Sequence, residues 1–182
     1  MAYKVNNIPK DYIGKHREYW NYFNSDSNGE HSGTCCGQAA IYSALRTLGW
    51  SYKLSFKYFV KNYPPNNFFG TLGTSRDEIV RIVGKNGYRV EQYHGENSLR
   101  QVLASGPAIV CLDVGAAGWG NWGLHWVAVF GYTKSHYYLN GWDGNTGADF
   151  RCSRDKFNKG WNTWLTNNAS QSSYWLGYVG SK

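Results

Sequence analysis

The chain has 182 residues, of which 42% are hydrophobic and 18% aromatic, with a formal net charge of +7 and a pI of about 9.2. This length suits one domain with a sizeable core. No apolar run approaches the roughly 20 residues of a membrane span, and the first residues lack the apolar region of a secretory signal. Localisation stays open between the cytosol, release from a longer precursor and export by a non-classical route.

The basic residues are scattered along the chain. A nucleic-acid site usually clusters them on one face, so we expect no nucleic-acid partner. The positive charge itself suits either an ordinary soluble surface or attraction to an anionic partner such as a cell wall. We expect a monomer.

Residues 1–29 are polar and aromatic without a clean period, which predicts an N-terminal arm, and residues 30–182 are expected to form a single domain. From Cys36 onward the apolar residues have helical spacing up to Leu48, which predicts a largely buried helix with Gly49 as its C-cap. Further helices are predicted at residues 55–63, 75–86, 98–106 and 154–161. Ser75 with Glu78 forms a capping box at the start of the second of these, and Ser153 is the expected cap of the last.

After Pro107 the pattern changes from helical to strand-like. Near-continuous apolar or alternating segments predict strands at residues 88–93, 107–114, 124–132, 137–140 and 173–179, with a hairpin turn at 133–136. Helices followed by antiparallel strands favour an α+β fold, with the buried N-terminal helix packed on the sheet.

The four cysteines are Cys35, Cys36, Cys111 and Cys152, and none forms a CxxC pair, so a zinc or thioredoxin-like site is unsupported. Cys111 lies in an apolar strand and is expected to be a buried small hydrophobe. Cys36 opens the predicted buried helix, whose dipole favours a thiolate. Gly37 would leave room there for a substrate backbone. Cys36 is therefore the candidate nucleophile, with no metal or cofactor required.

A nucleophilic thiol needs a base and a group that orients the base. Among five histidines, His125 opens an apolar strand directly after a glycine-rich loop, where a catalytic cleft would explain a polar residue. Asn140 ends the next predicted strand, which would bring it beside His125. Asp143 is the competing candidate for this third position.

These segments resemble a known family. "CGQAAIYSAL", "HWVAVFGY" and "NGWDGNTG" are similar, in this order, to the Cys, His and Asn motifs of papain-like cysteine peptidases. "CCGQAA" and "SLRQVLASGPAIVCLDV" resemble most the C39-like branch, which includes peptidases that cleave double-glycine leaders. The resemblance covers about residues 30–145 and implies a papain-like fold with Cys36, His125 and Asn140 as the catalytic triad.

One position departs from the family pattern. Both branches usually carry a Gln six residues before the nucleophile as an oxyanion donor, and this chain has Glu30 there. Three explanations are open. Asn28 or His31 takes the place of this oxyanion donor, or the loop before Cys36 differs in length from that of the family, or the domain binds a ligand without catalytic turnover. Gln38, after the nucleophile, is expected on the helix surface or as a neighbouring wall.

The tryptophans of the glycine-rich loop have two interpretations. Trp119 and Trp122 either form a cleft wall or lid before His125, or pack on the core.

The resemblance implies a cysteine peptidase acting on a peptide or protein substrate. The small size, the positive charge and the roles of related domains also suit the toxic domain of a delivered bacterial effector. The alternatives are a cell-wall or other amide hydrolase or acyl-transferase on the same scaffold, and an inactive papain-like binding domain.

Overall fold

A computed structural model describes part of the chain. The described residues are 36–48, 50, 56–65, 74–104, 106–118, 123–139, 151–163 and 174–181. The expected arm at residues 1–29 lies outside them. The helices are α2 (Cys36–Thr47), α3 (Phe56–Asn62), α4 (Arg76–Lys85), α5 (Gly95–Leu103) and α6 (Arg154–Trp161). The strands are β1 (Tyr88–His94), β2 (Ala108–Asp113), β3 (Leu124–Tyr132), β4 (His136–Leu139), β5 (Arg151–Ser153) and β6 (Tyr174–Ser181).

The strands form one six-stranded sheet in the order β1-β6-β2-β3-β4-β5. Every described pairing is antiparallel. β2 and β3 pair from Ala108↔Val129 to Asp113↔Leu124 and form the centre of the sheet. β6 comes last along the chain but lies between β1 and β2. The predicted α+β fold with an antiparallel sheet is confirmed.

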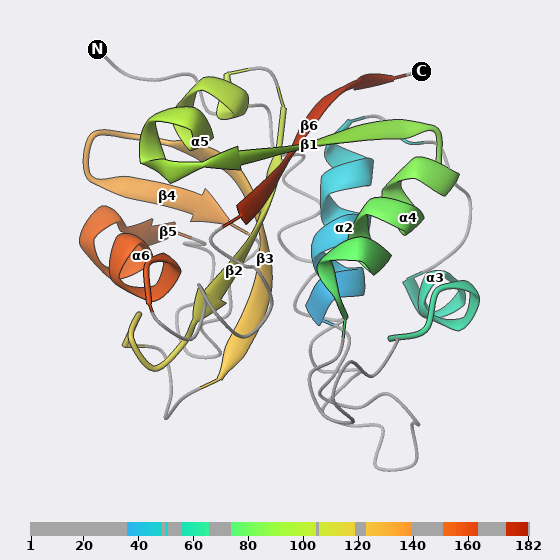
Figure 1. The fold of residues 1–182 in the computed structure, drawn as a ribbon, viewed down its shortest axis with the longest axis horizontal. Helices are drawn as coiled ribbons and strands as arrows, with labels where there is room; N and C mark the ends of the chain where they lie inside the picture. The colour runs from blue at the N-terminus through green and yellow to red at the C-terminus, as the bar shows by residue number, and fades with distance from the viewer. Residues whose placement is uncertain are drawn as a thin grey trace.

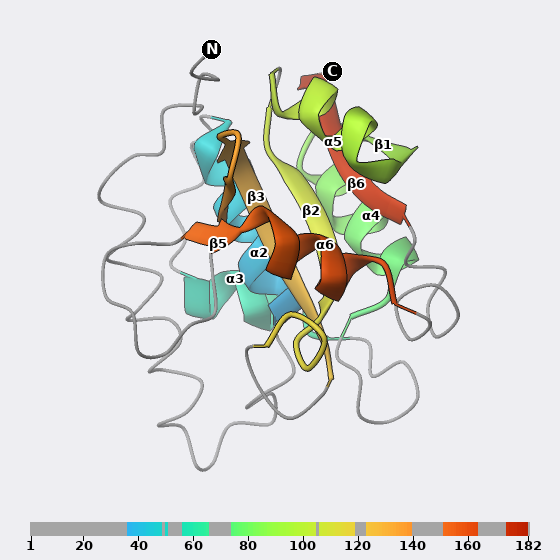
Figure 2. The ribbon, with the colours of Figure 1, turned by 90° about the vertical axis from the view of Figure 1, so that its left-hand side faces the viewer.

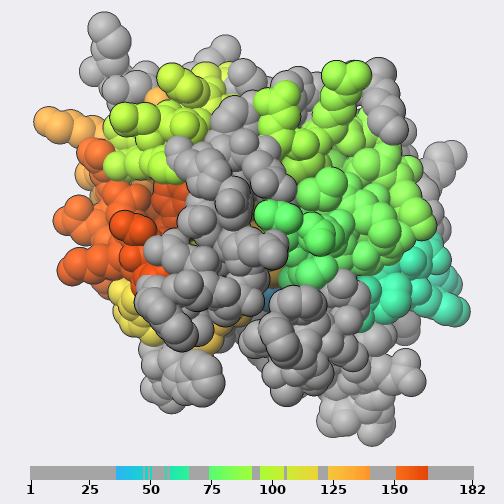
Figure 3. Space-filling model, viewed as in Figure 1, coloured from blue at the N-terminus to red at the C-terminus, as the bar shows by residue number. Residues whose placement is uncertain are grey.

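Helices cover both faces of the sheet, with α2, α3 and α4 on one side and α5 and α6 on the other (Figures 1 and 2). Along β2, Ile109 and Cys111 belong to the core cluster with α2, whereas Val110 and Leu112 belong to the cluster with α5 and α6. Burial on both faces explains why this strand is apolar at successive positions. In the view of Figure 3, α5 and α6 form one flank of the surface and α3 and α4 the other.

α2 is buried nearly all round. Its small residues Ala40 and Ala44 and the larger Ile41 and Leu45 are all at most 5% exposed. The helix contacts β3 on one side and α3 and α4 on the other. An apolar pattern on all sides of a helix is typical of such an enclosed position. The predicted burial of this helix on the sheet is confirmed.

Side-chain caps fix the first turns of two helices. The Ser75 hydroxyl accepts a hydrogen bond from the backbone N–H of Glu78 at 3.2 Å, at the start of α4. The Ser153 hydroxyl accepts one from the backbone N–H of Lys156 at the start of α6. Each satisfies a backbone donor that the helix itself leaves open. Both caps were predicted from the sequence.

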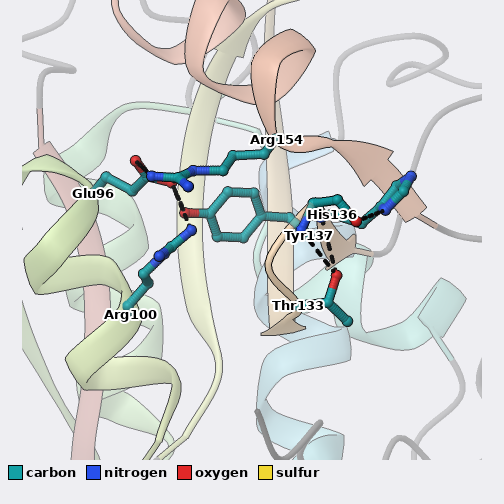
Figure 4. A network of polar contacts seen from close by, with 7 residues as sticks. Glu96, Arg100, Thr133, His136, Tyr137 and Arg154 are labelled. Carbon is teal, nitrogen blue, oxygen red and sulfur yellow. Dashed lines mark hydrogen bonds and ion pairs between the residues drawn. The ribbon is translucent and has the colours of Figure 1, made fainter. Parts of the chain in front are cut away.

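A group of charged residues joins α5, β4 and α6 on the side of the sheet opposite α2 (Figure 4). The Glu96 carboxylate accepts hydrogen bonds from Arg154 Nε at 2.6 Å, Arg154 Nη2 at 2.8 Å and the Tyr137 hydroxyl at 2.6 Å. Arg100 Nη2 lies 3.2 Å from Glu96 Oε1. Burial alone would raise the pKa of Glu96. The hydrogen bonds from Arg154, Tyr137 and Asn158 and the charge of Arg100 outweigh it and lower the pKa to about 2.

Most element boundaries follow the sequence prediction. β3 and α6 have the predicted ends, and β6 is close to its predicted range. The helix expected from residue 98 begins earlier, at Gly95, directly after β1. Gly95 has a φ of +78°, which lets the chain leave the strand and enter the helix without an intervening loop. β5, only three residues long, was not predicted.

Candidate active site

Cys36 is the first residue of α2, as predicted, and its thiol is free. The side chain is partly buried and packs against the α2 side of the core, in the cluster that also contains Trp126 of β3 and Cys111 of β2. The N-terminal end of a helix offers backbone N–H groups that the helix does not use. The fold therefore places the Cys36 thiol where a buried helix end meets the central sheet.

The surroundings of this thiol act on its charge in two opposing ways. Burial raises the pKa of Cys36 above its ordinary value, while the backbone N–H groups of Trp126, Gly37 and Cys36 itself favour the thiolate. Burial is the larger effect. The sequence predicted that the helix end would favour the thiolate. That direction is correct for the backbone contribution, but the net direction is the opposite because the site is desolvated.

His125 lies near the beginning of β3 and is half-buried. It pairs with Leu112 of β2 and directly precedes Trp126, the residue whose backbone N–H acts on the Cys36 thiol. The structure thus brings Cys36 to the backbone of β3 at the residue that follows His125. Cys36 and His125 are 89 positions apart in the sequence (125 − 36).

Side chains alternate along β3 between the two faces of the sheet. Trp126 belongs to the cluster on the α2 side, whereas Val127 and Val129 belong to the cluster on the α5 side. His125 has the parity of Val127. The strand pattern thus assigns His125 to the α5 side of β3, whereas Cys36 packs on the α2 side.

The predicted third residue lies outside the described residues. β4 ends at Leu139, which pairs with Val129 of β3. His125 lies four positions along β3 from Val129 (129 − 125), or about 13 Å at the rise of a strand. Asn140 follows Leu139 by one residue and Asp143 by four. Both candidates come from the segment that directly follows β4.

Other predicted positions also fall outside the described residues, and the assignments made for them stay predictions: Asn28, Glu30, His31, Cys35, Trp119 and Trp122.

Gln38 was expected on the helix surface or as a neighbouring wall, and the surface alternative is wrong. Its side chain is fully buried, and Oε1 accepts a hydrogen bond from the Thr74 hydroxyl at 2.9 Å. The Thr74 carbonyl in turn accepts one from Trp126 Nε1 at 2.9 Å. The partly exposed positions of α2 are Cys36, Ala39, Ser43 and Arg46, and Gln38 lies on a different face of the helix, which is enclosed. The sequence carries a signal for this burial, because Gln38 is the single amide side chain in the largely apolar segment that forms α2.

Gly37 has a different role from the one predicted. A Cβ built at this position would lie 2.5 Å from Thr74 Cβ and 2.7 Å from its hydroxyl oxygen. Glycine is therefore needed so that Thr74 can approach the first turn of α2. The space beside Gly37 holds Thr74, where the sequence suggested a substrate backbone.

The other described cysteines have surroundings unlike that of Cys36. Cys111 and Cys152 are buried in the core, and burial raises the pKa of both, that of Cys152 to about 12. The pKa of Cys111 is raised further by the nearby Cys36. Neither thiol has the partly exposed position that a nucleophile requires. Cys36 is the best placed of the three.

Within the described ranges, no group of three or more His, Cys, Asp or Glu side chains is arranged to hold a metal ion. None of the helices described above combines the length and apolar character needed to cross a bilayer.

Comparison with known proteins gives matches at the level of structure. No family model matches the sequence, and no curated protein matches it. A solved structure described as a C39-like peptidase from Bacillus anthracis is similar over 82% of this chain and 91% of its own, with a TM-score of 0.59 and 14% identity.

Two further solved structures show the same likeness. The peptidase domain of Streptococcus ComA, a bifunctional ABC transporter of a quorum-sensing pathway, has a TM-score of 0.57 and 17% identity, over 81% of this chain and 93% of its own. A double-glycine-motif protease from an AMS/PCAT transporter, in complex with its leader peptide, has a TM-score of 0.53 and 14% identity, over 80% and 84%.

Proposed function

We propose that this chain, which has the papain-like fold of the C39-like and double-glycine peptidases, is a cysteine peptidase that uses Cys36, His125 and Asn140. One observation carries the proposal. The Cys36 thiol, at the start of the buried helix α2, lies against the backbone of Trp126, the residue that follows His125. A nucleophile at a helix end beside a histidine-bearing strand is the arrangement that thiol acyl transfer needs.

The raised pKa of Cys36 defines the role of His125 in the proposed reaction. Because burial keeps the thiol protonated, attack on a carbonyl requires a base that accepts the proton. In the proposed reaction the Cys36 sulfur bonds to the carbonyl carbon as His125 takes the thiol proton. His125 then returns this proton to the leaving amine as the C–N bond breaks. Water, deprotonated by the same imidazole, releases the acyl group and restores the thiol.

The oxyanion and the third residue complete the proposed machinery. The backbone N–H of Cys36, at the helix start, is one donor to the oxyanion. Asn140 would orient His125, with Asp143 as its competitor, since both follow the end of β4. The proposed substrate is a peptide, by analogy with the neighbour that was solved with a leader peptide. A role as a delivered effector is a finer proposal, and growth arrest by the wild type but not by Cys36→Ser on expression in a target cell would support it.

The first experiment measures the rate at which iodoacetamide alkylates each cysteine between pH 4 and 9. We expect Cys36 to react fastest and His125→Ala to slow it at pH 6 by at least about tenfold, the effect of one pKa unit. Cys111 and Cys152 serve as internal controls. His136→Ala is the matched variant, because His136 is also half-buried in the sheet but lies in β4 and bonds Ser135. If the alkylation rate of Cys36 is unchanged in His125→Ala, the proposed pairing of the Cys36 thiol with the His125 imidazole is refuted.

The second measurement is turnover. A peptide pool from a proteome digest, incubated with the wild type and with Cys36→Ser, is compared by mass spectrometry for new termini. Termini that appear only with the wild type support a peptidase.

The second candidate function is a binding domain without turnover. The observation that favours it is the net rise in the pKa of Cys36. It predicts that Cys36→Ser retains as much peptide as the wild type and that neither yields cleavage products.

A further inference from the structure

Two buried polar side chains stand at the base of the candidate nucleophile's helix. Gln38 is 0% exposed and Thr74 is 3% exposed, and among the described residues they are the polar side chains of the core. They bond to each other, with the Thr74 hydroxyl donating to Gln38 Oε1 at 2.9 Å. Gln38 lies two positions after Cys36, in the first turn of α2. Thr74 directly precedes the cap of α4.

Thr74 connects this first turn to β3. Its carbonyl accepts the hydrogen bond from Trp126 Nε1 at 2.9 Å. Its side chain fills the space above Gly37 so closely that a Cβ there would lie 2.5 Å away. One residue therefore contacts both the helix turn that carries Cys36 and the strand residue whose N–H acts on the Cys36 thiol.

The amide of Gln38 is only partly satisfied within the described part of the chain. Its Nε2 is buried and has no hydrogen-bond partner there. Leaving a buried donor unsatisfied costs stability. An apolar residue of similar volume would avoid this cost. Departures of this kind from the best local choice are typical of functional sites, which raises the question of what the amide does.

We propose that Gln38 and Thr74 are positioning residues of the candidate active site, and that their hydrogen bond holds the first turn of α2 against Trp126 so that the Cys36 thiol stays at the backbone of β3. This inference rests on the proposed function of Cys36. Neither residue is proposed to touch the substrate. They act through the helix turn and through the Trp126 indole.

If the hydrogen bond holds this turn in place, it also affects the pKa of Cys36, which can be measured. The N–H of Trp126 favours the Cys36 thiolate only while the turn is held in place. The titratable groups carried by the elements around α2 near this point are Cys111 on β2, His125 on β3, and Arg76 and Asp77 at the start of α4. None of them moves directly when the Thr74 hydroxyl is removed. Loss of the hydroxyl should therefore raise the pKa of Cys36 through position alone.

The test compares the pH dependence of Cys36 alkylation in Thr74→Val, Thr74→Ser and the wild type. Valine keeps the shape of threonine and removes the hydroxyl, whereas serine keeps the hydroxyl. We expect Thr74→Val to slow alkylation at pH 7 by about threefold to tenfold, up to one pKa unit, and Thr74→Ser to restore the wild-type profile. Gln38→Met, which removes the amide from the other side, should act like Thr74→Val.

Ser75→Ala is the matched control for stability. It removes the adjacent hydroxyl, which caps α4, and the loss of a cap costs about as much stability as the loss of one buried hydrogen bond. It should lower the melting temperature as Thr74→Val does and leave the Cys36 profile unchanged. A Thr74→Val profile identical to that of Ser75→Ala would overturn the proposal. If Thr74→Val does not fold, Gln38→Met takes its place, with Thr74→Ser still expected to match the wild type. A Cys36 alkylation profile of Gln38→Met equal to that of Ser75→Ala would then overturn the proposal.

Failure here is distinguishable from failure of the proposed function. If His125→Ala leaves Cys36 unaffected while Thr74→Val slows it, the positioning pair is supported and the peptidase is refuted. If His125→Ala slows Cys36 and Thr74→Val does not, the positioning pair alone is refuted.

Discussion

Replacing Glu96 by Gln should reveal how much the charged group between α5, β4 and α6 stabilises the fold. The pKa of Glu96 falls from an ordinary 4.5 to about 2, a change of about 2.5 units. At 1.36 kcal/mol per unit this is about 3.4 kcal/mol. The side chain is 21% exposed, so solvent screens part of the effect. We expect Glu96→Gln to lower the free energy of unfolding at pH 7 by about 2–3 kcal/mol.

The sign of the pH dependence follows from the direction of the shift. A carboxyl group with a lower pKa in the folded state stabilises that state fully above its unfolded pKa of about 4.5. The contribution is lost as the pH falls through the folded value of about 2. The wild type should therefore lose about 2–3 kcal/mol more than Glu96→Gln between pH 5 and pH 2, and the two stabilities should converge in acid.

Urea unfolding followed by tryptophan fluorescence at pH 7, 5, 4, 3 and 2.5 measures this difference. Asp77→Asn is the control, because it makes the same change from carboxylate to amide at a side chain that is 83% exposed and paired with Arg76. It should cost at most about 1 kcal/mol. A difference between wild type and Glu96→Gln that stays constant from pH 7 to pH 2.5 would refute the electrostatic explanation.

Three helical glycines give predictions of opposite sign. Gly37→Ala should destabilise the fold by about 1–3 kcal/mol, because its Cβ would meet Thr74 at 2.5 Å. Gly160→Ala in α6 should do so too, since its Cβ would lie 2.8 Å from Ala117 Cβ. Gly84→Ala in α4 meets nothing within 4 Å and should stabilise the fold by about 1 kcal/mol through helix propensity. Thermal unfolding of the three variants measures all three changes.

Because Ala is the better helix former at each position, close contact alone sets the sign for Gly37 and Gly160. Stabilisation in either variant would contradict the packing described at that helix.

The sequence alone predicts the parts of the fold that depend on local patterns. α2 and β3 follow from apolar spacing, and the cap at Ser75 follows from a hydroxyl three residues before Glu78. Cys36 and His125 are predicted as site residues because the start of a helix and the start of a strand can be recognised from the sequence alone. The packing of α2 on β3 brings together the two elements that carry them.

Other features depend on contacts between distant segments. Nothing local to β6 indicates that it pairs with both β1 and β2. The burial of Gln38 depends on Thr74, 36 residues away, and so does the need for glycine at position 37. The pKa of Cys36 depends on how much apolar surface encloses it, which the helix pattern does not report. Desolvation is a property of the assembled core.

The place of β6 in the sheet has a consequence for how the chain matures on the ribosome. β1 and β2 have no neighbour on their facing edges until residues 174–181 have been synthesised, since Tyr88 pairs with Ser181, 93 positions later (181 − 88). An emerging chain therefore presents two open strand edges, which are sites for mispairing with other chains. α2 and β3 are synthesised long before the sheet can close around them. The central sheet therefore reaches its full set of described pairings only after residues 174–181 have been translated.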